Sequence, residues 1–230
     1  MAGTSGAGET AEEAEDDPRG ERRAPIVVTM LIAMAIPHLM PPEVTSVMRF
    51  VVTGLLATLL IAMLVMDPGR IDRATAGVHR VRMALITVLA AGAAYATVRL
   101  ATVILTGSAG ADSATDLFRA GGLVWVYLVI AFGFVYWELD GGGPGARIHR
   151  PKEHPDLLFP QHADASIAPP DWRPVFVDYL YVAFTTATGF GPADTVPLAH
   201  WAKLATAIQA VASLVVIGLV LARAINILAA

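Results

Sequence analysis

The segment Asp178–Pro197 reads DYLYVAFTTATGFGPADTVP, and the interpretation of the whole chain depends on it. An acidic residue begins the segment, aromatic residues and threonines follow, and a Gly-Phe-Gly sequence ends its apolar part. A long apolar run, roughly Ala202–Leu228, comes next. In a membrane protein, a short apolar segment that ends in glycine beside a full-length run has two interpretations. It is either a re-entrant helix that returns to the side it came from, or a short, polar sixth span.

The composition is that of a membrane protein. Of the 230 residues, 55% are hydrophobic and only 16% are charged, and the charges are grouped between apolar runs. This pattern is typical of polytopic membrane proteins. The chain has no Cys, which excludes disulfides, thiolate metal sites and thiol nucleophiles. The formal net charge of −4 comes largely from residues 1–18 and gives no support to nucleic-acid binding.

Four parts follow one another along the chain. Residues 1–24 form a disordered acidic tail, because Gly, Ala, Glu and Asp predominate there without apolar periodicity. Residues 25–137 hold four apolar runs, residues 138–174 form a polar loop rich in Gly and Pro, and residues 175–230 hold the short segment and the final run. The four runs of the second part are Pro25–Met40, Val47–Met66, Met83–Leu105 and Gly121–Trp137.

Each run is predicted to be a helix embedded in lipid. The runs have about 15–25 residues, and about 20 are needed to cross the hydrocarbon core. Backbone groups in hydrocarbon must be hydrogen-bonded within the segment, which a helix achieves. We therefore predict an all-α polytopic bundle of about six transmembrane helices, or of five plus a re-entrant helix. The lipid bilayer, as the inner or plasma membrane of a bacterium, is the predicted location.

The basic residues predict which side each loop occupies, since Lys and Arg concentrate in cytoplasmic loops. Basic residues occur before the first run, between Arg70 and Arg82, and between Arg147 and Arg173. The loops between these regions have few. The pattern predicts a cytoplasmic N-terminus and four spans that return the chain to the cytoplasm before Val175.

The last part then has two possible courses. If Val175–Gly189 crosses the membrane, the loop Phe190–His200 lies outside, the C-terminus lies inside and the spans number six. If Val175–Gly189 re-enters, it does so from the cytoplasmic side and leaves the C-terminus outside. The charge distribution favours six spans over the re-entrant course.

The residues Thr186-Ala187-Thr188-Gly189-Phe190-Gly191-Pro192 carry a resemblance to a known family. With the aromatic residues before them and the long run after them, they resemble the pore module of the potassium-channel superfamily. In that module a short helix leads to a Thr-Val-Gly-Tyr-Gly-Asp filter, where backbone carbonyls of four copies replace the hydration shell of an ion. The glycines permit the backbone angles that align these carbonyls.

The resemblance implies a function and particular residues for it. The chain would be a channel subunit for potassium or another monovalent cation, assembled as a homo-oligomer. Thr186, Thr188, Gly189, Phe190 and Gly191 would line the narrowest part of the pore. The sequence departs from the family in two ways, with Ala187 in place of a threonine and Pro192 in place of the aspartate. The family also inserts this loop from outside, opposite to the side that the basic residues indicate.

A second resemblance covers most of the chain. The sequence DYLYVAFT at residues 178–185, the later Ala-Asp and the ending AINIL at residues 224–228 resemble a family of uncharacterised bacterial inner-membrane proteins. This resemblance implies a polytopic membrane fold without an established activity. It supports a non-conducting protein with a structural or transport-accessory role as the alternative function.

Two charged residues of the C-terminal part form a predicted pair. An acidic residue within a membrane segment is a functional candidate by default. In the six-span interpretation Asp178 lies near the cytoplasmic end of the fifth helix and Arg223 near the end of the sixth, so we predict an intramembrane ion pair. The alternative is that both side chains simply reach the interface.

The sequence gives no sign of an enzyme. It has no nucleophile elbow, no paired carboxylates within a span and no phosphate-binding loop. His149, His154 and His162 share the polar loop, but their spacing matches no standard metal pattern. We therefore expect no catalytic residue, no cofactor and no bound metal.

Overall fold

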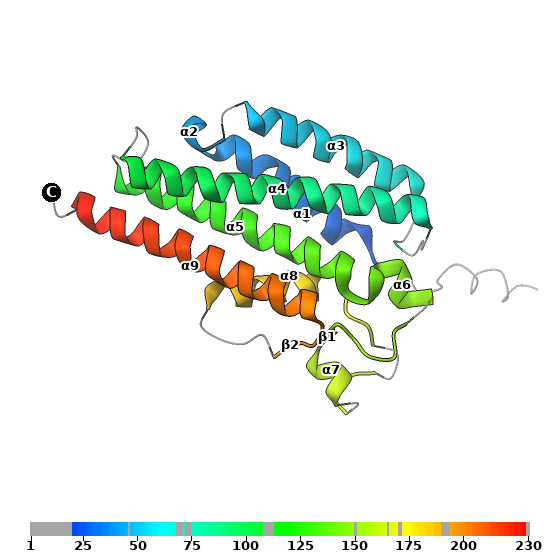
Figure 1. Ribbon diagram of the computed structural model, residues 1–230. Coiled ribbons are helices and arrows are strands. Elements are labelled where there is room, and N and C mark those ends of the chain that lie inside the picture. Colours follow the sequence, from blue (N-terminus) through cyan, green and yellow to red (C-terminus); the bar gives the residue numbers. More distant parts are fainter. Residues whose placement is uncertain are drawn as a thin grey trace, which may run out of the picture.

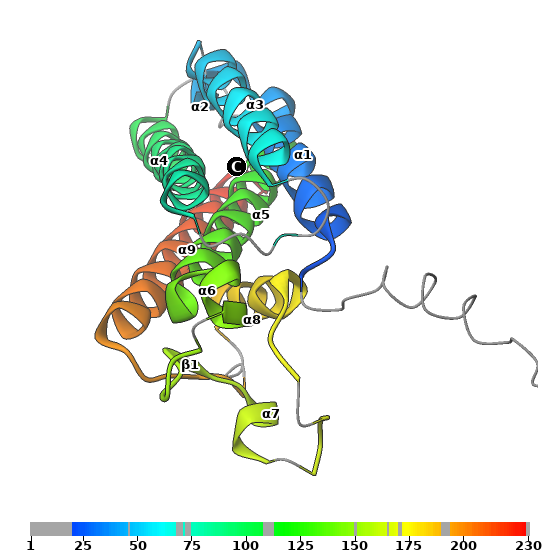
Figure 2. The same ribbon diagram turned by 90° about the vertical axis from the view of Figure 1, so that its right-hand side faces the viewer.

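The computed structural model describes residues 20–45, 47–67, 71, 75–107, 113–149, 151–164, 166–169, 172–189 and 194–228. Within these ranges, five helices have 17 or more residues and lie side by side as a bundle (Figures 1 and 2). They are α1 (Arg23–Leu39), α3 (Met48–Met66), α4 (Ala76–Thr106), α5 (Ala114–Leu139) and α9 (His200–Leu228).

Shorter elements connect these helices. They are α2 (Pro42–Thr45), η2 (Asp140–Gly142), α6 (Pro144–His149), α7 (Pro160–Ala163) and α8 (Phe176–Thr188), with the strands β1 (Leu157–Leu158) and β2 (Val196–Pro197). Four helices are long and apolar enough to span a membrane, namely α3, α4, α9 and the stretch Ala114–His149 that contains α5. The shorter α1 is also apolar. The protein is thus an all-α, multi-pass membrane protein.

The bundle has two distinct ends. At one end α1 begins and α5 finishes, because Trp137 Nε1 donates to the carboxylate of Glu21 at 3.0 Å. The first turn of α4 lies at the same end, where His79 Nδ1 is 2.9 Å from Glu138 Oε1. Most of the Arg and Lys residues of the described chain are near this end, which we call the basic end. The other, far end holds α2 and the end of α4, where Arg99 donates to the carbonyl of Glu43 at 2.8 Å.

Two helices extend further than the sequence indicates. The predicted third span begins at Met83, but α4 begins at Ala76, after Thr75 accepts a hydrogen bond from the backbone N–H of Val78. The predicted fourth span is Gly121–Trp137, whereas α5 runs from Ala114 to Leu139. Charged residues therefore lie inside these helices at the basic end, where they neutralise one another.

The helix α8 starts at the basic end and stops partway along the bundle. Its Tyr179 hydroxyl donates to Asp140 Oδ2 at 2.6 Å, just past the end of α5. Near its other end, Trp125 Nε1 donates to the carbonyl of Ala187 at 3.4 Å, and Trp125 lies about halfway along α5. The 13 residues of α8 cover about 20 Å, well short of the hydrocarbon core, which is about 30 Å thick.

The chain then comes back to the basic end before α9 begins. Val196 and Pro197 of β2 pair with Leu158 and Leu157 of β1. The N–H of Leu198 donates to the carbonyl of Asp156 at 2.9 Å, and Asp156 Oδ2 accepts from the N–H of Gly141 beside the end of α5. Figures 1 and 2 show α8 beside α5 and α9, and Figure 1 shows β2 directly before the start of α9.

Close packing against α5 fixes the position of α8. A Cβ added at Gly133 would lie 3.3 Å from the backbone Cα of Leu180 and 3.1 Å from its Cδ1. The two backbones approach this closely only because position 133 has no side chain, which is the usual reason for small residues at membrane helix contacts.

We predict that Gly133→Val lowers the thermal unfolding midpoint in detergent, because the added methyl groups push α8 away from α5. Overpacking of this kind costs about 1–3 kcal/mol. Gly122→Val is the matched control, since a Cβ at Gly122 meets nothing within 4 Å. An equal loss of stability in both variants would show that the cost comes from helix propensity rather than from the α5–α8 contact.

Candidate functional site

The candidate site is α8 together with the parts of α5 and α9 that hold it. One face of α8 is buried against the bundle and includes Tyr179 and Ala183, both 0% exposed. The opposite face is apolar and exposed, with Val177 at 53%, Tyr181 at 59% and Phe184 at 48%. An apolar outward face is what a helix in contact with lipid or with another protein requires.

A buried glutamine of α9 joins the three helices. Gln209 is 0% exposed. Its Nε2 donates to the carbonyl of Ala183 in α8 at 2.6 Å, and its Oε1 accepts from the Tyr136 hydroxyl of α5 at 2.6 Å. Ser213, one turn further along α9, is also fully buried, and its hydroxyl has no hydrogen-bond partner in the described part of the chain. Polar side chains therefore follow α9 towards the tip of α8.

The tip of α8 holds the described members of the predicted filter. Thr188 donates through its hydroxyl to the carbonyl of Thr185 at 2.8 Å, and Thr185 donates to the carbonyl of Tyr181 at 3.0 Å. Thr186 lies on the same last turn and is half-buried. Gly189 follows the helix with φ +68°, a left-handed conformation that favours glycine. The predicted filter residues Phe190 and Gly191 lie outside the described residues.

The direction of α8 gives its tip an electrostatic character. The C-terminal end of a helix carries about half a negative charge, because its last carbonyls have no N–H partner within the helix. Of these last carbonyls, that of Ala187 accepts from Trp125 and that of Thr185 from the Thr188 hydroxyl, and one turn earlier the carbonyl of Ala183 accepts from Gln209. The tip is thus a negative pole partway along the bundle, where Thr188 is half-buried and Gly189 exposed, and donors of the same chain satisfy it in part.

The predicted ion pair between Asp178 and Arg223 is not formed. The Asp178 carboxylate accepts from the backbone N–H of Val175 at 2.7 Å and so caps the start of α8 at the basic end. Arg223 follows Val220, which packs against Gly121 near the start of α5, at the far end. The prediction assumed that α8 crosses the membrane and that α9 runs back. Because α9 starts at the basic end instead, the two side chains lie at opposite ends of the bundle.

A buried ion cluster at the basic end is missing from the sequence analysis. Glu138 is 0% exposed, Asp67 1% and Arg82 2%. Arg82 Nε lies 2.9 Å from Glu138 Oε2, and its Nη1 lies 3.7 Å from Asp67 Oδ2. His79 contacts the other oxygen of Glu138 at 2.9 Å and is about half exposed. The sequence does contain a signal for this cluster, because each of the three charged residues stands directly beside an apolar run. Consecutive runs that cross a bundle bring these ends together at one side.

A second cluster connects the N-terminal segment to α8. Glu21 accepts from Trp137 Nε1, from Arg147 at 3.2 Å and from the backbone N–H of Phe176 at 3.0 Å. Burial raises the pKa of Glu21, and the positive charge of Arg147 and the hydrogen bonds oppose that rise. The Arg147 guanidinium also donates to the carbonyls of Trp137 and Asp140, at 2.6 and 2.8 Å. This cluster fixes where α8 begins.

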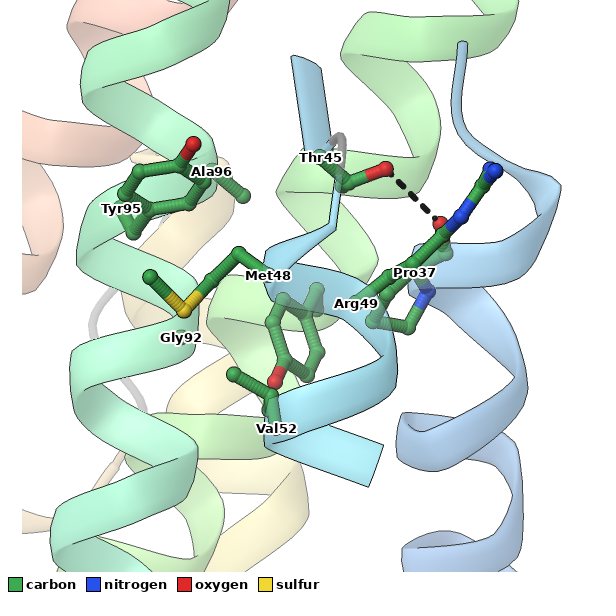
Figure 3. Close-up of a pocket in the computed structure, with 9 residues that line it drawn as sticks. Pro37, Thr45, Met48, Arg49, Val52, Gly92, Tyr95 and Ala96 are labelled. Atoms are coloured by element: carbon green, nitrogen blue, oxygen red, sulfur yellow. Dashed lines mark hydrogen bonds between the residues drawn. The ribbon is translucent and has the colours of Figure 1, made fainter. Parts of the chain in front are cut away.

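A small cavity at the far end is too small for a substrate. Its volume is about 10 Å³, and it is lined by residues from α1 to α5, among them Thr45, Met48 and Gly92 (Figure 3). Thr45 donates to the carbonyl of Pro37 across the chain reversal at 3.1 Å. Such a volume holds one water molecule at most. It is therefore a packing feature of the far end.

The described residues contain no group of three or more His, Cys, Asp or Glu side chains arranged to hold a metal ion. Comparisons of the chain with protein-family models, with curated proteins and with solved structures find no match. The site must therefore be interpreted from its own geometry and chemistry.

We predict that Arg82→Leu strongly destabilises the protein, because it leaves the carboxylates of Glu138 and Asp67 buried without their cation. Removing one partner of a buried ion pair costs about 3–5 kcal/mol. Arg80→Leu is the matched control, because Arg80 is exposed and, within the described part of the chain, donates to a carbonyl of its own helix, that of Ala76. The unfolding midpoint of each variant is measured in mixed micelles with an increasing fraction of denaturing detergent. Equal midpoints for the two variants would contradict a stabilising role for the cluster.

Proposed function

We propose that this protein is a subunit of a pore-loop-type channel for a monovalent cation such as potassium. In this proposal α1, α3, α4, α5 and α9 cross the membrane, and α8 is a re-entrant helix. The observation that carries the proposal is the course of α8, which starts at the basic end, ends about halfway along α5, and is followed by a return to the basic end.

This course favours five spans over the six that the charge distribution alone favours. A helix of 13 residues is too short to cross. In the six-span arrangement, the segment that follows α8 would lie at the far end. Instead, Val196 and Pro197 pair with β1 at the basic end. We therefore propose five spans plus a re-entrant helix, the course that the charge distribution favours less.

The basic residues orient this arrangement. The basic end includes Arg22, Arg23, Arg80, Arg82, Arg147, Lys152 and Arg173, whereas the far end has Arg49, Arg99, Arg119 and Arg223. Because Lys and Arg concentrate on the cytoplasmic side, we place the N-terminus in the cytoplasm of a cell bounded by an inner or plasma membrane. The helix α8 then enters from the cytoplasm, and the C-terminus lies outside.

The mechanism follows from the position of the α8 tip. A cation in the middle of the bilayer needs a negative pole and oxygen ligands to replace water. The C-terminal end of α8 supplies the negative pole. The backbone from Thr186 to Gly191 would supply the oxygen ligands. Irregular backbone at this depth cannot face lipid, because its polar groups would lack hydrogen bonds. It must line a water-filled path or contact another protein, which a homo-oligomer with α8 near its axis provides.

One observation favours the alternative, a non-conducting protein with a structural or transport-accessory role. The carbonyls of Ala183 and Ala187 already accept hydrogen bonds from Gln209 and Trp125 of the same chain. The hydroxyls of Thr185 and Thr188 are likewise bound within α8. A tip satisfied in this way needs no ion, and such a protein would be stable as a monomer.

We predict that Glu153→Cys and Asp194→Cys are labelled from the same side of the membrane and Glu43→Cys from the other. All three side chains are exposed, and the chain has no native Cys. In intact cells a membrane-impermeant maleimide should label Glu43→Cys only. Glu153→Cys and Asp194→Cys should react only after the membrane is permeabilised, because they lie at the basic end, which we place in the cytoplasm.

Other labelling patterns have distinct meanings. If positions 153 and 194 are on opposite sides, α8 crosses the membrane and the five-span arrangement is wrong. If both react from outside and position 43 does not, the orientation is reversed. In that case α8 enters from outside, as the pore helix of the potassium-channel superfamily does.

We predict that the purified protein in liposomes conducts potassium and that Gly189→Ala reduces the flux about tenfold. Alanine at φ +68° carries a strain of about 1–2 kcal/mol, and 1.4 kcal/mol corresponds to a tenfold change in population. Gly218→Ala is the control, because a Cβ at Gly218 of α9 meets nothing within 4 Å. Unchanged flux in Gly189→Ala would remove the filter assignment. A wild-type monomer without flux would favour the alternative.

A further inference from the structure

A cavity at the basic end has the lining of an anion site. Its volume is about 230 Å³, and it lies between the end of α5, α6, α7 and the segment that leads into α8. Among the described residues, three cationic side chains line it, those of Arg147, Lys152 and Arg173, against one carboxylate, that of Asp140.

Acidic groups behind the wall hold two of the cations in place. Arg147 is held by Glu21 at 3.2 Å and by two backbone carbonyls. Lys152 Nζ lies 2.7 Å from Asp156 Oδ2, which also accepts the N–H of Gly141. Glu21 and Asp156 are not part of the cavity lining. The two cations are therefore fixed in orientation, while the acids that fix them stand away from the space a ligand would occupy.

The carboxylate in the wall is already occupied. Asp140 is 3% exposed, and it accepts the Tyr179 hydroxyl at 2.6 Å and the N–H of Leu157 at 3.2 Å. Its oxygens are therefore engaged by these donors, and its negative charge is outweighed by the three cationic side chains of the lining. Arg173 is exposed, and its guanidinium has no ion-pair or hydrogen-bond partner in the described part of the chain. It is a charged donor at the rim of the cavity with its hydrogen-bonding capacity unused.

His162 and Trp172 complete the polar wall. Their rings are in edge contact with centroids 5.2 Å apart. Burial lowers the pKa of His162, although the negative charge of Asp140 opposes this shift. A neutral imidazole still carries one N–H donor, which adds to the donors of Lys152 and Arg173.

We infer that this cavity binds a phosphate group, either in the headgroup of an anionic lipid or as free inorganic phosphate. Fixed Arg and Lys side chains with neutral N–H donors are the groups that recognise phosphate oxygens. The position beside the end of a membrane helix matches the basic sites that bind lipid headgroups at a membrane surface. Phosphate would connect Lys152 and Arg173 across the cavity and so brace the segment that leads into α8. This inference does not depend on whether the protein conducts ions.

The test compares two ligands and two matched variants of the full chain in neutral detergent. The dissociation constant is measured from the rise of the thermal midpoint with ligand concentration, for phosphatidylglycerol and for inorganic phosphate. Phosphatidylcholine and chloride at equal ionic strength are the reference ligands. Arg173→Gln removes the rim donor. Arg80→Gln is the control, an exposed arginine at the same end that does not line the cavity.

We expect phosphatidylglycerol to stabilise the protein and Arg173→Gln to weaken its binding about tenfold, the effect of one charge-assisted hydrogen bond. Arg80→Gln should bind as the wild type does. Free phosphate would be identified as the ligand if inorganic phosphate stabilises the protein and phosphatidylglycerol does not. In that case Arg173→Gln should weaken phosphate binding about tenfold. Stabilisation by neither ligand, or an equal loss in both variants, would overturn the inference. Lys152→Gln provides a second variant if Arg173→Gln does not fold.

Discussion

In the proposed re-entrant course, the absence of water in the membrane interior is the constraint on which the structure of α8 depends. A helix that ends there leaves its last carbonyls without backbone partners, and each unsatisfied group costs several kcal/mol in hydrocarbon. In this protein the indole of Trp125 and the hydroxyl of Thr188 supply donors to two of these carbonyls, those of Ala187 and Thr185, and the amide of Gln209 donates one turn earlier to the carbonyl of Ala183. Gln209 is itself satisfied by Tyr136. In the proposed re-entrant course, these donors allow α8 to end within the membrane.

Two ion clusters lie at the basic end, and one of them contacts the start of α8. Arg82, Glu138 and Asp67 join the ends of α3, α4 and α5, and Glu21 and Arg147 join the N-terminal segment to α5 and α8. Buried charges are costly unless they are paired and hydrogen-bonded. The first cluster therefore holds α3, α4 and α5 together at this end, and the second fixes the start of α8 against α5.

The sequence predicts the long helices well, because an apolar run of sufficient length has little choice but to be a helix in lipid. It predicts the surroundings of α8 poorly. The run Val175–Gly189 is compatible with crossing and with re-entry, and the difference lies in the pairing of Val196 with Leu158 and in the contact of Gly133 with Leu180. Neither contact has a local signal. The Asp178–Arg223 prediction failed for the same reason, since it depended on the direction of α9.

The side from which α8 enters bears on regulation more than on ion binding. In the proposed re-entrant arrangement, the negative pole at the tip comes from the direction of the helix, which points from one membrane surface towards the middle of the bilayer whichever surface that is. A cation halfway across would therefore meet the same field in either orientation. What the orientation changes is which compartment contacts the start of α8. With the basic end in the cytoplasm, the polar elements from η2 to β1 and the Glu21–Arg147 cluster face the cytoplasm, so a cytoplasmic ligand could shift α8 directly, whereas an external one would have to act through α5 or α9.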